Sequence, residues 1–219
     1  MILLSYLKRY LYSFCDLIFP PSEEVSRLQS MPTEEFVSLG KPHETPHPWI
    51  YSLFSYKEPL IRELVWQIKY KQNKILTERV GLLLAEEIES IIEDRKELDT
   101  KCEYILIPIP LSSTRLRERG YNQSKNIAHA ICAHTKLVRI ETGALIRTKQ
   151  GVSQTKTRSR TERLSAIKNS FSLKDKNYVH NKYVILLDDV TTTGATLSEA
   201  RKEILKGKPK EVIAFTVAH

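Results

Sequence analysis

The chain has 219 residues, of which 41% are hydrophobic, so it is long and apolar enough for one α/β domain with an appendage. Its 34 lysines and arginines outnumber its 26 acidic residues, and the net charge of +8 favours a polyanionic partner, either a polyphosphate ligand or nucleic acid. No apolar run approaches the roughly 18 residues that cross a bilayer, and Cys15, Cys102 and Cys132 form no Cys-x-x-Cys pair. We therefore expect no membrane-spanning helix, no zinc or redox motif of paired cysteines, and a location in the reducing cytoplasm.

The first quarter of the sequence, residues 1–55, is expected to form an arm that precedes the main domain. Residues 1–19 are rich in Leu, Tyr and Phe but are interrupted by two basic residues, which predicts an amphipathic helix. This helix would dock on its own domain or on a partner, and attachment to a membrane surface is the alternative. Pro20 and Pro21 end the helix, and the polar, proline-rich residues 22–48 are interpreted as irregular.

Residues 56–219 are expected to form the main domain, which begins with two helices. Residues 56–70 carry apolar side chains at helical spacing, with Pro59 in the first turn. Thr77 is the expected N-cap of the second helix. The run EYILIPIP at residues 103–110 then predicts the first strand of the core.

A basic segment, residues 111–123, follows this strand and is interpreted as a loop. Arg115, Arg117 and Arg119 cluster beside Gly120, and Asn122 is the expected cap of the next helix. In a parallel sheet this loop would lie at the carboxyl edge, where its arginines could neutralise a pyrophosphate group. A merely solvated loop is the alternative.

A second basic stretch, residues 148–163, is too polar for the core and separates two predicted strands. It is interpreted as a mobile lid or a nucleic-acid contact, with a plain exposed loop as the alternative. Strand material is expected on either side of it, at residues 137–147 and 171–173. The run EVIAFTVA at 211–218 is the expected closing strand.

The most informative stretch of the sequence is YVILLDDVTTTGATL at residues 183–197. A short apolar run predicts a buried parallel strand over 183–187, and Asp188 and Asp189 follow at its carboxyl end. A hydroxyl-rich turn leads into a helix that is stopped by Gly207 and Pro209. An ordinary strand before a helix capped by Asp189 or by a threonine is the alternative.

The order of strand, acidic pair, hydroxyl-rich turn and helix predicts a site for a phosphorylated sugar. A helix N-terminus offers unpaired N–H groups to a phosphate, and Gly194 lets the backbone approach it closely. The carboxylates of Asp188 and Asp189 would accept hydrogen bonds from sugar hydroxyls or hold Mg²⁺. No Gly-Lys-Ser/Thr follows a strand, so a P-loop nucleotidase is disfavoured.

This stretch resembles the signature with which type I phosphoribosyltransferases bind 5-phosphoribosyl 1-pyrophosphate (PRPP). The resemblance implies that Asp188 and Asp189 are catalytic residues that bind the ribose hydroxyls. It also implies that the following loop wraps the 5-phosphate. That loop consists of Thr191, Thr192, Thr193, Gly194, Ala195 and Thr196.

Four stretches together resemble the ComF family, a competence-associated branch of the phosphoribosyltransferases. They lie at residues 17–21, 60–70, 107–124 and 184–196, and the second ends in Lys-Tyr at 69–70. The run Arg-Gly-Tyr-Asn-Gln-Ser within the third is quite specific to that family. Members typically carry an N-terminal zinc ribbon of paired cysteines, but Ser-Glu-Glu stands at the corresponding place here. The resemblance therefore implies an arm that corresponds to the ribbon without its metal.

The sequence thus predicts a three-layer α/β domain with a mostly parallel sheet of the type I phosphoribosyltransferase kind, preceded by a helical arm. The expected function is PRPP binding assisted by Mg²⁺, with possible transfer of the phosphoribosyl group to an acceptor that no residue identifies. Arg115, Arg117, Arg119 and Lys149 are the candidates for the pyrophosphate group.

The alternative function is a non-enzymatic one, a factor that handles single-stranded DNA during DNA uptake. The two basic stretches favour it, and Arg158 and Arg160 are the candidate contacts with DNA. Its mark would be salt-sensitive DNA affinity without release of pyrophosphate. Nothing in the sequence predicts an oligomeric state.

Overall fold

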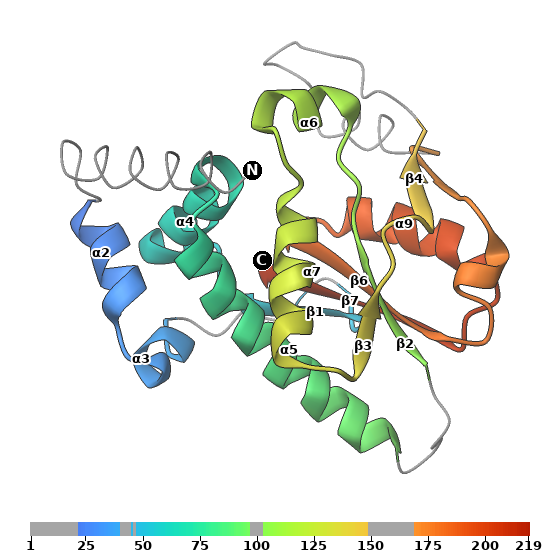
Figure 1. The fold of residues 1–219 in the computed structure, drawn as a ribbon, viewed down its shortest axis with the longest axis horizontal. Helices are drawn as coiled ribbons and strands as arrows, with labels where there is room; N and C mark the ends of the chain where they lie inside the picture. Colours follow the sequence, from blue (N-terminus) through green and yellow to red (C-terminus); the bar gives the residue numbers. More distant parts are fainter. Residues whose placement is uncertain (1–21, 40–44, 46, 97–102, 149–168) are drawn as a thin grey trace, which may run out of the picture.

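A five-stranded sheet, parallel throughout, forms the centre of the molecule (Figure 1). The computed structural model describes residues 22–39, 45, 47–96, 103–148 and 169–219. In spatial order the strands are β1 (Ile50–Phe54), β7 (Glu211–Ala218), β6 (Tyr183–Val190), β2 (Tyr104–Pro108) and β3 (Val138–Ile140). Because all five strands run the same way, their carboxyl ends meet at one edge, which is where open α/β sheets bind ligands.

Helices cover one face of the sheet, and a helix with a small second sheet covers the other. The first face carries α4 (Pro59–Trp66), the π-helix η1 (Gln67–Lys71), α5 (Lys74–Lys96) and α7 (Gln123–His134). The second carries α9 (Ala195–Leu205) and an antiparallel pair, β4 (Leu145–Arg147) and β5 (Phe171–Leu173). The predicted three-layer α/β fold is therefore confirmed.

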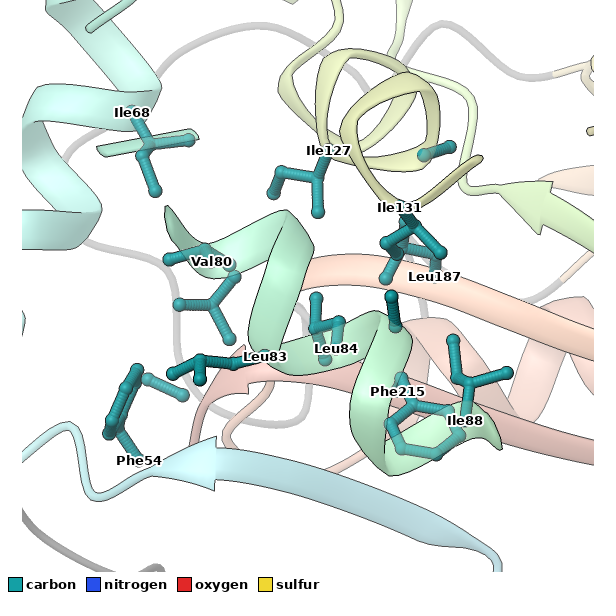
Figure 2. Packing of buried hydrophobic residues seen from close by; sticks show 14 of the residues in the cluster. Phe54, Ile68, Val80, Leu83, Leu84, Ile88, Ile127, Ile131, Leu187 and Phe215 are labelled. Carbon is teal, nitrogen blue, oxygen red and sulfur yellow. The ribbon is translucent and has the colours of Figure 1, made fainter. Parts of the chain in front are cut away.

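The side chains of β6 explain why its sequence reads as a continuous apolar run. Val184 and Leu186 belong to the core on the α9 side, whereas Ile185 and Leu187 belong to the core on the α5 side. Both faces of the strand are thus buried, as expected for a central parallel strand. Figure 2 shows the α5 side, where Leu84 and Ile88 of α5 lie close to Leu187 and Phe215 of the sheet.

Helices α5 and α7 pack closely because α5 has a glycine at their contact. A Cβ atom on Gly81 would lie 2.4 Å from the Cβ atom of Ala130 in α7, which no real pair of side chains tolerates. This close contact fixes α7 against α5 and the sheet. It therefore also fixes the N-terminal turn of α7, which reaches the carboxyl edge of β6.

The basic segment 111–123 is a helix rather than the expected loop. Helix α6 spans Ser113–Arg119, and Ser112 caps it because its Oγ accepts a hydrogen bond from the N–H of Arg115 at 3.3 Å. Gly120 ends the helix with a φ of 77°. The prediction failed because α6 has no buried side chain and so no apolar periodicity to show in the sequence.

Other element boundaries also differ from the prediction. Residues 22–48, expected to be irregular, contain α2 (Glu23–Ser30) and α3 (Thr33–Val37). Asn73 caps α5 in place of Thr77, because its Oδ1 accepts from the N–H of Leu76 at 3.2 Å. The expected strand material at 137–147 is divided between β3 in the central sheet and β4 in the small sheet. The short 3-10 helix η2 (Lys176–Tyr178) lies before β6.

Part of the predicted arm belongs to the main fold. Strand β1 lies within residues 1–55 but pairs with β7 along the edge of the central sheet. Leu28 and Phe36, from α2 and α3, are buried in the same core cluster as the helices of the first face. Apolar contact therefore ties the described part of the arm to the domain. The helix predicted at 1–19 lies outside the described residues.

Candidate functional site

The acidic pair lies at the carboxyl end of β6, the middle strand of the sheet. Strand β6 extends beyond the predicted residue 187 and includes Asp188 and Asp189 before it ends at Val190. The N-terminal turn of α7 lies against both aspartates, because Gln123 bonds to Asp189 and Ser124 bonds to Asp188. Three elements therefore meet here: the end of β6, the turn that follows it, and the start of α7.

Asp189 is buried and fully engaged by the protein. Its Oδ2 accepts from Nε2 of Gln123 at 2.6 Å, and its Oδ1 accepts from the N–H of Val190 at 2.6 Å. The ammonium of Lys69 lies 3.3 Å from the same Oδ1, and the Asp189 side chain is only 7% exposed. A buried carboxylate needs such partners, so Asp189 is a fixed part of the site's frame.

Asp188 is half-buried and keeps one oxygen for a ligand. Its Oδ1 accepts from Oγ of Ser124 at 3.1 Å and from the N–H of Asp189 at 2.9 Å. Among the described residues none donates a hydrogen bond to its Oδ2. Withdrawal from water and the neighbouring negative charge of Asp189 raise the pKa of Asp188 from 3.8 to about 7, against smaller opposing effects that include Lys69.

A π-helix brings Lys69 to the acidic pair. The element η1 spans Gln67–Lys71 and ends at Gln72 in the left-handed conformation, with a φ of 52°. The hydroxyl of Tyr121 ties it down, because it donates to the carbonyl of Ile68 and accepts from the N–H of Gln72, both at 3.0 Å. π-Helical turns are rare and are frequent at functional sites, and this one places a cation against Asp189.

The turn after β6 is closed by its own first threonine. Thr191 is buried, and its Oγ1 accepts from the N–H of Gly194 at 3.2 Å while its N–H donates to the carbonyl of Ala218 at 3.1 Å. Thr191 therefore shapes the turn. Thr192 and Thr193 at its tip are exposed, so their hydroxyls remain open to a ligand.

Gly194 is required by both its backbone and its neighbours. Its φ of 70° is a left-handed conformation that favours glycine. A Cβ atom at this position would also lie 2.6 Å from Cδ2 of His47. Gly194 is the N-cap of α9 and offers no capping side chain, so the alternative of a helix capped by Asp189 or a threonine does not hold. The N–H groups of Ala195 and Thr196 in the first turn stay without intrahelical acceptors.

Of the three predicted arginines, Arg115 lies beside Arg147, which in turn is near Asp188. Burial lowers the pKa of Arg147, the nearby positive charge of Arg115 lowers it further, and the negative charge of Asp188 opposes both effects. Arg119 instead lies over the ring of Tyr70, at 5.1 Å from the ring centroid. No described contact joins Arg117 to the site. Lys149, Arg158 and Arg160 lie outside the described residues.

Four residues of the site were not assigned to it from the sequence: Lys69, Gln123, Ser124 and Arg147. The first lies in the Lys-Tyr pair at 69–70, and the next two lie in the run at 119–124 that supported the family resemblance. Those motifs could have indicated them as partners of the acidic pair. Arg147 stands at the end of a short strand with no motif around it. Its Nε is buried without a partner among the described residues.

The donor set fits Mg²⁺ only if a ligand supplies further oxygens. Asp189 already bonds to three protein groups, which leaves Oδ2 of Asp188 as the carboxylate oxygen for a cation. Mg²⁺ is commonly held by one or two carboxylates together with substrate phosphates, and this arrangement suits that use. Within the described residues no cluster of three His, Cys, Asp or Glu side chains would hold a metal by itself.

The cysteine in the described part of the chain agrees with the expectation of unpaired thiols. Cys132 is free and half-buried, and burial raises the pKa of its thiol, as an inert thiol requires. Cys15 and Cys102 lie outside the described ranges. The absence of bound zinc stays a prediction.

Within the described ranges, no helix is both long enough and apolar enough to cross a membrane.

The described residues form a three-layer α/β protein with an acidic pair at the carboxyl end of the middle strand of its parallel sheet. The chain is 31% identical over 165 residues to Competence protein F of Haemophilus influenzae, a match that covers 74% of this chain and 69% of that protein. The chain belongs to the ComF family. No protein-family model matches it.

Two further relatives support this assignment. Competence protein ComFC of Bacillus subtilis is 37% identical over 117 residues, which is 52% of this chain and 44% of that protein. DNA utilization protein YhgH of Escherichia coli O6:H1 is 25% identical over 176 residues, which is 80% of this chain and 74% of that protein. The chain therefore spans less than half the length of ComFC.

Solved structures of similar architecture include hypoxanthine phosphoribosyltransferases. The enzyme from Staphylococcus aureus has a TM-score of 0.40 and 12% identity, covering 64% of this chain and 61% of that chain. The enzyme from Trypanosoma cruzi has a TM-score of 0.38 and 16% identity, covering 71% and 64%. Scores this low give no basis for assigning an activity.

Proposed function

We propose that the chain binds PRPP at the carboxyl end of β6, where Asp188 would hold Mg²⁺ together with oxygens of the ligand. The observation that carries this proposal is the position of the acidic pair. Asp188, whose Oδ2 accepts no hydrogen bond from the described residues, lies one short turn before the N-terminus of α9, which has no side-chain cap. A carboxylate suits ribose hydroxyls, and a helix N-terminus suits a phosphate. Together they match the two ends of a ribose 5-phosphate.

Each part of the ligand has a proposed partner. Asp188 accepts from a ribose hydroxyl, while Asp189 holds Lys69 and the N-terminal turn of α7 in place. The N–H and hydroxyl groups of Thr192, Thr193 and Thr196 donate to the 5-phosphate. Thr191 closes the loop, because its hydroxyl accepts from the N–H of Gly194, and its own O–H remains a donor for the ligand.

Arg115 and Arg147 are the described cations best placed for the pyrophosphate group. Arg147 combines a buried Nε that lacks a described partner with a position close to Asp188. Binding a polyanion would relieve the repulsion between the two guanidinium groups. Mg²⁺ would supply further neutralisation of phosphate charge.

The location of the protein in the cytoplasm stays a prediction.

Transfer of the phosphoribosyl group is the further step that such a site would allow. The bond from C1 of the ribose to the pyrophosphate oxygen would break, and an acceptor atom would form the new bond to C1. The departing pyrophosphate would carry away the bonding electron pair, stabilised by the arginines. The described residues include no base that identifies the acceptor.

Calorimetric titration with PRPP, with and without Mg²⁺, tests the proposed function. We expect saturable binding that tightens with Mg²⁺, and weaker binding of ribose 5-phosphate and of pyrophosphate as separate probes. Binding of ribose 5-phosphate tests the proposed contacts at the start of α9, and binding of pyrophosphate tests the proposed contacts with the arginines. A protein that binds none of the three, with Mg²⁺ present, would contradict the proposal.

Handling of single-stranded DNA is a second candidate function. It draws on two relatives, a competence protein and a DNA utilization protein, and on the net charge of +8. Such a function predicts DNA affinity that falls steeply with salt and depends weakly on sequence. DNA binding without pyrophosphate release would favour it over transfer.

A further inference from the structure

Two large aromatic side chains next to the site are exposed, although side chains of this kind are usually mostly buried. Trp66, the last residue of α4, is 43% exposed, and Tyr70 in η1 is 55% exposed. They lie four residues apart, with ring centroids 6.0 Å from each other and a tilt of 46° between the rings. Exposed aromatic clusters of this kind mark interaction surfaces.

Positive charges lie directly on these rings. The ammonium of Lys71 is 5.2 Å from the centroid of the Trp66 ring, and the guanidinium of Arg119 is 5.1 Å from that of Tyr70. Each cation gains from the electron-rich face of its ring. The rings and the cations therefore form one surface, although they come from two distant segments of the sequence.

A hollow of about 500 Å³ adjoins the two rings, and basic side chains are among the residues that line it. Arg62 and Lys69 both line it. The acid among the lining residues, Glu63, is held by Gln67, whose Nε2 donates to its Oε1 at 2.9 Å. Because Lys69 is paired with Asp189, three further cations, Arg62, Lys71 and Arg119, stand against one acid across the rings and the hollow. This balance fits an anionic partner better than an apolar one.

We propose that this surface, formed by Trp66, Tyr70, Lys71 and Arg119 with the adjoining hollow, binds single-stranded DNA by stacking bases on the aromatic rings. The inference rests on the second candidate function and gives it a place on the molecule. Single strands expose the faces of their bases, and proteins bind them with aromatic platforms set among positive charges. A duplex keeps its bases stacked on one another and offers no such faces.

The position of Lys69 places this surface beside the ligand site. Lys69 is one of the residues that line the hollow, and its ammonium lies 3.3 Å from Oδ1 of Asp189. DNA in the hollow would therefore lie next to the carboxyl edge of β6 without occupying it. Binding at the two places should be separable by mutation, which makes the inference testable independently of PRPP.

Tryptophan fluorescence tests the stacking directly, because the chain has only two tryptophans, Trp49 and Trp66. Trp49 packs between His47 and Arg201, outside the surface. In a Trp49→Phe protein, titration with an oligothymidylate of about 15 nucleotides should quench the emission of Trp66. In a Trp66→Phe protein, which retains Trp49, the same titration should leave the emission nearly unchanged.

Affinity measurements on folded variants complete the test. At low salt, Trp66→Ala and Tyr70→Ala should each weaken oligothymidylate binding by about 5-fold to 150-fold, the value of one stacked base. Lys71→Ala should also flatten the dependence on salt. Lys176→Ala, an exposed lysine in η2, is the matched control that should change little. PRPP binding should be retained in Trp66→Ala.

Two outcomes would overturn the inference and are distinguishable. If the parent binds no oligothymidylate at low salt, both the surface and the second candidate function fail. If the parent binds it but Trp66 is not quenched and Trp66→Ala binds equally well, DNA binds elsewhere and this surface is not the site. Neither result bears on PRPP, which the calorimetric titration tests separately.

Discussion

The N-termini of α7 and α9 lie at the same edge of the sheet but are completed in opposite ways. Helix α7 is closed by Asn122, whose Oδ1 accepts from the N–H of Lys125 at 3.3 Å while its Nδ2 donates to the carbonyl of Ile109 at 3.0 Å. Helix α9 starts at Gly194 with no capping side chain. The protein thus caps one helix end with its own side chain and leaves the other without a side-chain cap.

This difference assigns two roles at one edge. The capped helix presents side chains to the acidic pair, with Gln123 and Ser124 bonded to the two carboxylates. The uncapped helix presents backbone N–H groups, which suit a phosphate. A fixed frame on one side and open donors on the other are what a binding site for a sugar phosphate requires.

The largest effect should follow from closing the open end. In Gly194→Val, the side chain must adopt a left-handed backbone, which costs about 1–2 kcal/mol, and must displace His47. Because several phosphate donors would shift together, PRPP affinity should fall by at least about a hundredfold, given about 1.5–3 kcal/mol for each charged hydrogen bond. Titration calorimetry measures this.

Gly120→Val is the matched control for that change. Gly120 has a similar φ of 77°, but no described atom lies within 4 Å of the position of its Cβ. Backbone strain is therefore comparable, while the loop before α9 is untouched. Equal loss of PRPP binding in both variants would mean that strain, rather than the loop, causes the effect.

Removing one charge from the acidic pair should have the next largest effect. Asp188→Asn keeps the size of the side chain but exchanges a carboxylate oxygen for a donor, so PRPP affinity should fall about tenfold to a hundredfold. Asp189→Asn should weaken binding by a similar amount and also lower stability, because the ion pair with Lys69 is lost. Equal PRPP affinity in the parent and both variants would show that the site is wrongly placed.

The pH dependence of folding should report Asp188. Its pKa is raised to about 7 in the folded state, so the folded protein binds an extra proton between about pH 4 and pH 7. The free energy of unfolding should therefore decrease as the pH rises through this window and level off above it. Asp188→Asn should flatten this decrease by an amount on the order of 1 kcal/mol or more.

Urea unfolding at several pH values measures this contribution. Asp94→Asn, an exposed aspartate in α5, serves as the control for a general change in charge. If Asp94→Asn and Asp188→Asn give the same pH profile as the parent, Asp188 titrates normally and the account of its surroundings is wrong.

The smallest effect should come from the end that the protein closes itself. Asn122→Ala removes the cap of α7 and should destabilise the fold by about 1 kcal/mol, measured by urea unfolding. PRPP affinity should change little, because the donors to the 5-phosphate lie on the other helix. A large loss of PRPP affinity with unchanged stability would mean that the ligand binds at the start of α7 and not at the start of α9.

The sequence predicted those parts of the site whose signal is local. The strand before Asp188 is apolar on both faces, and the turn and helix follow it without interruption, so residues 183–197 could be interpreted as one unit. Asn122 was also predicted correctly as a cap. In each case the residues that interact lie within a few positions of each other.

The parts that the sequence could not predict depend on distant contacts. Lys69 and Asp189 are 120 positions apart, and only the fold brings the π-helix to β6. Helix α6 has no buried face and therefore resembles a loop. Strand β1 is short and follows a polar, proline-rich stretch, so its pairing with β7 could not be inferred from the residues around it.

Backbone amide NMR during titration with PRPP and Mg²⁺ tests the central claim most directly. The account predicts that the largest shifts fall on the amides of residues 191–197, with smaller shifts at Asp188 and Asp189. The amides at the start of α7, which Asn122 caps, should move less. Shifts centred on α7, or no shift at any amide at saturating PRPP, would contradict the claim that the open end of α9 is the phosphate site.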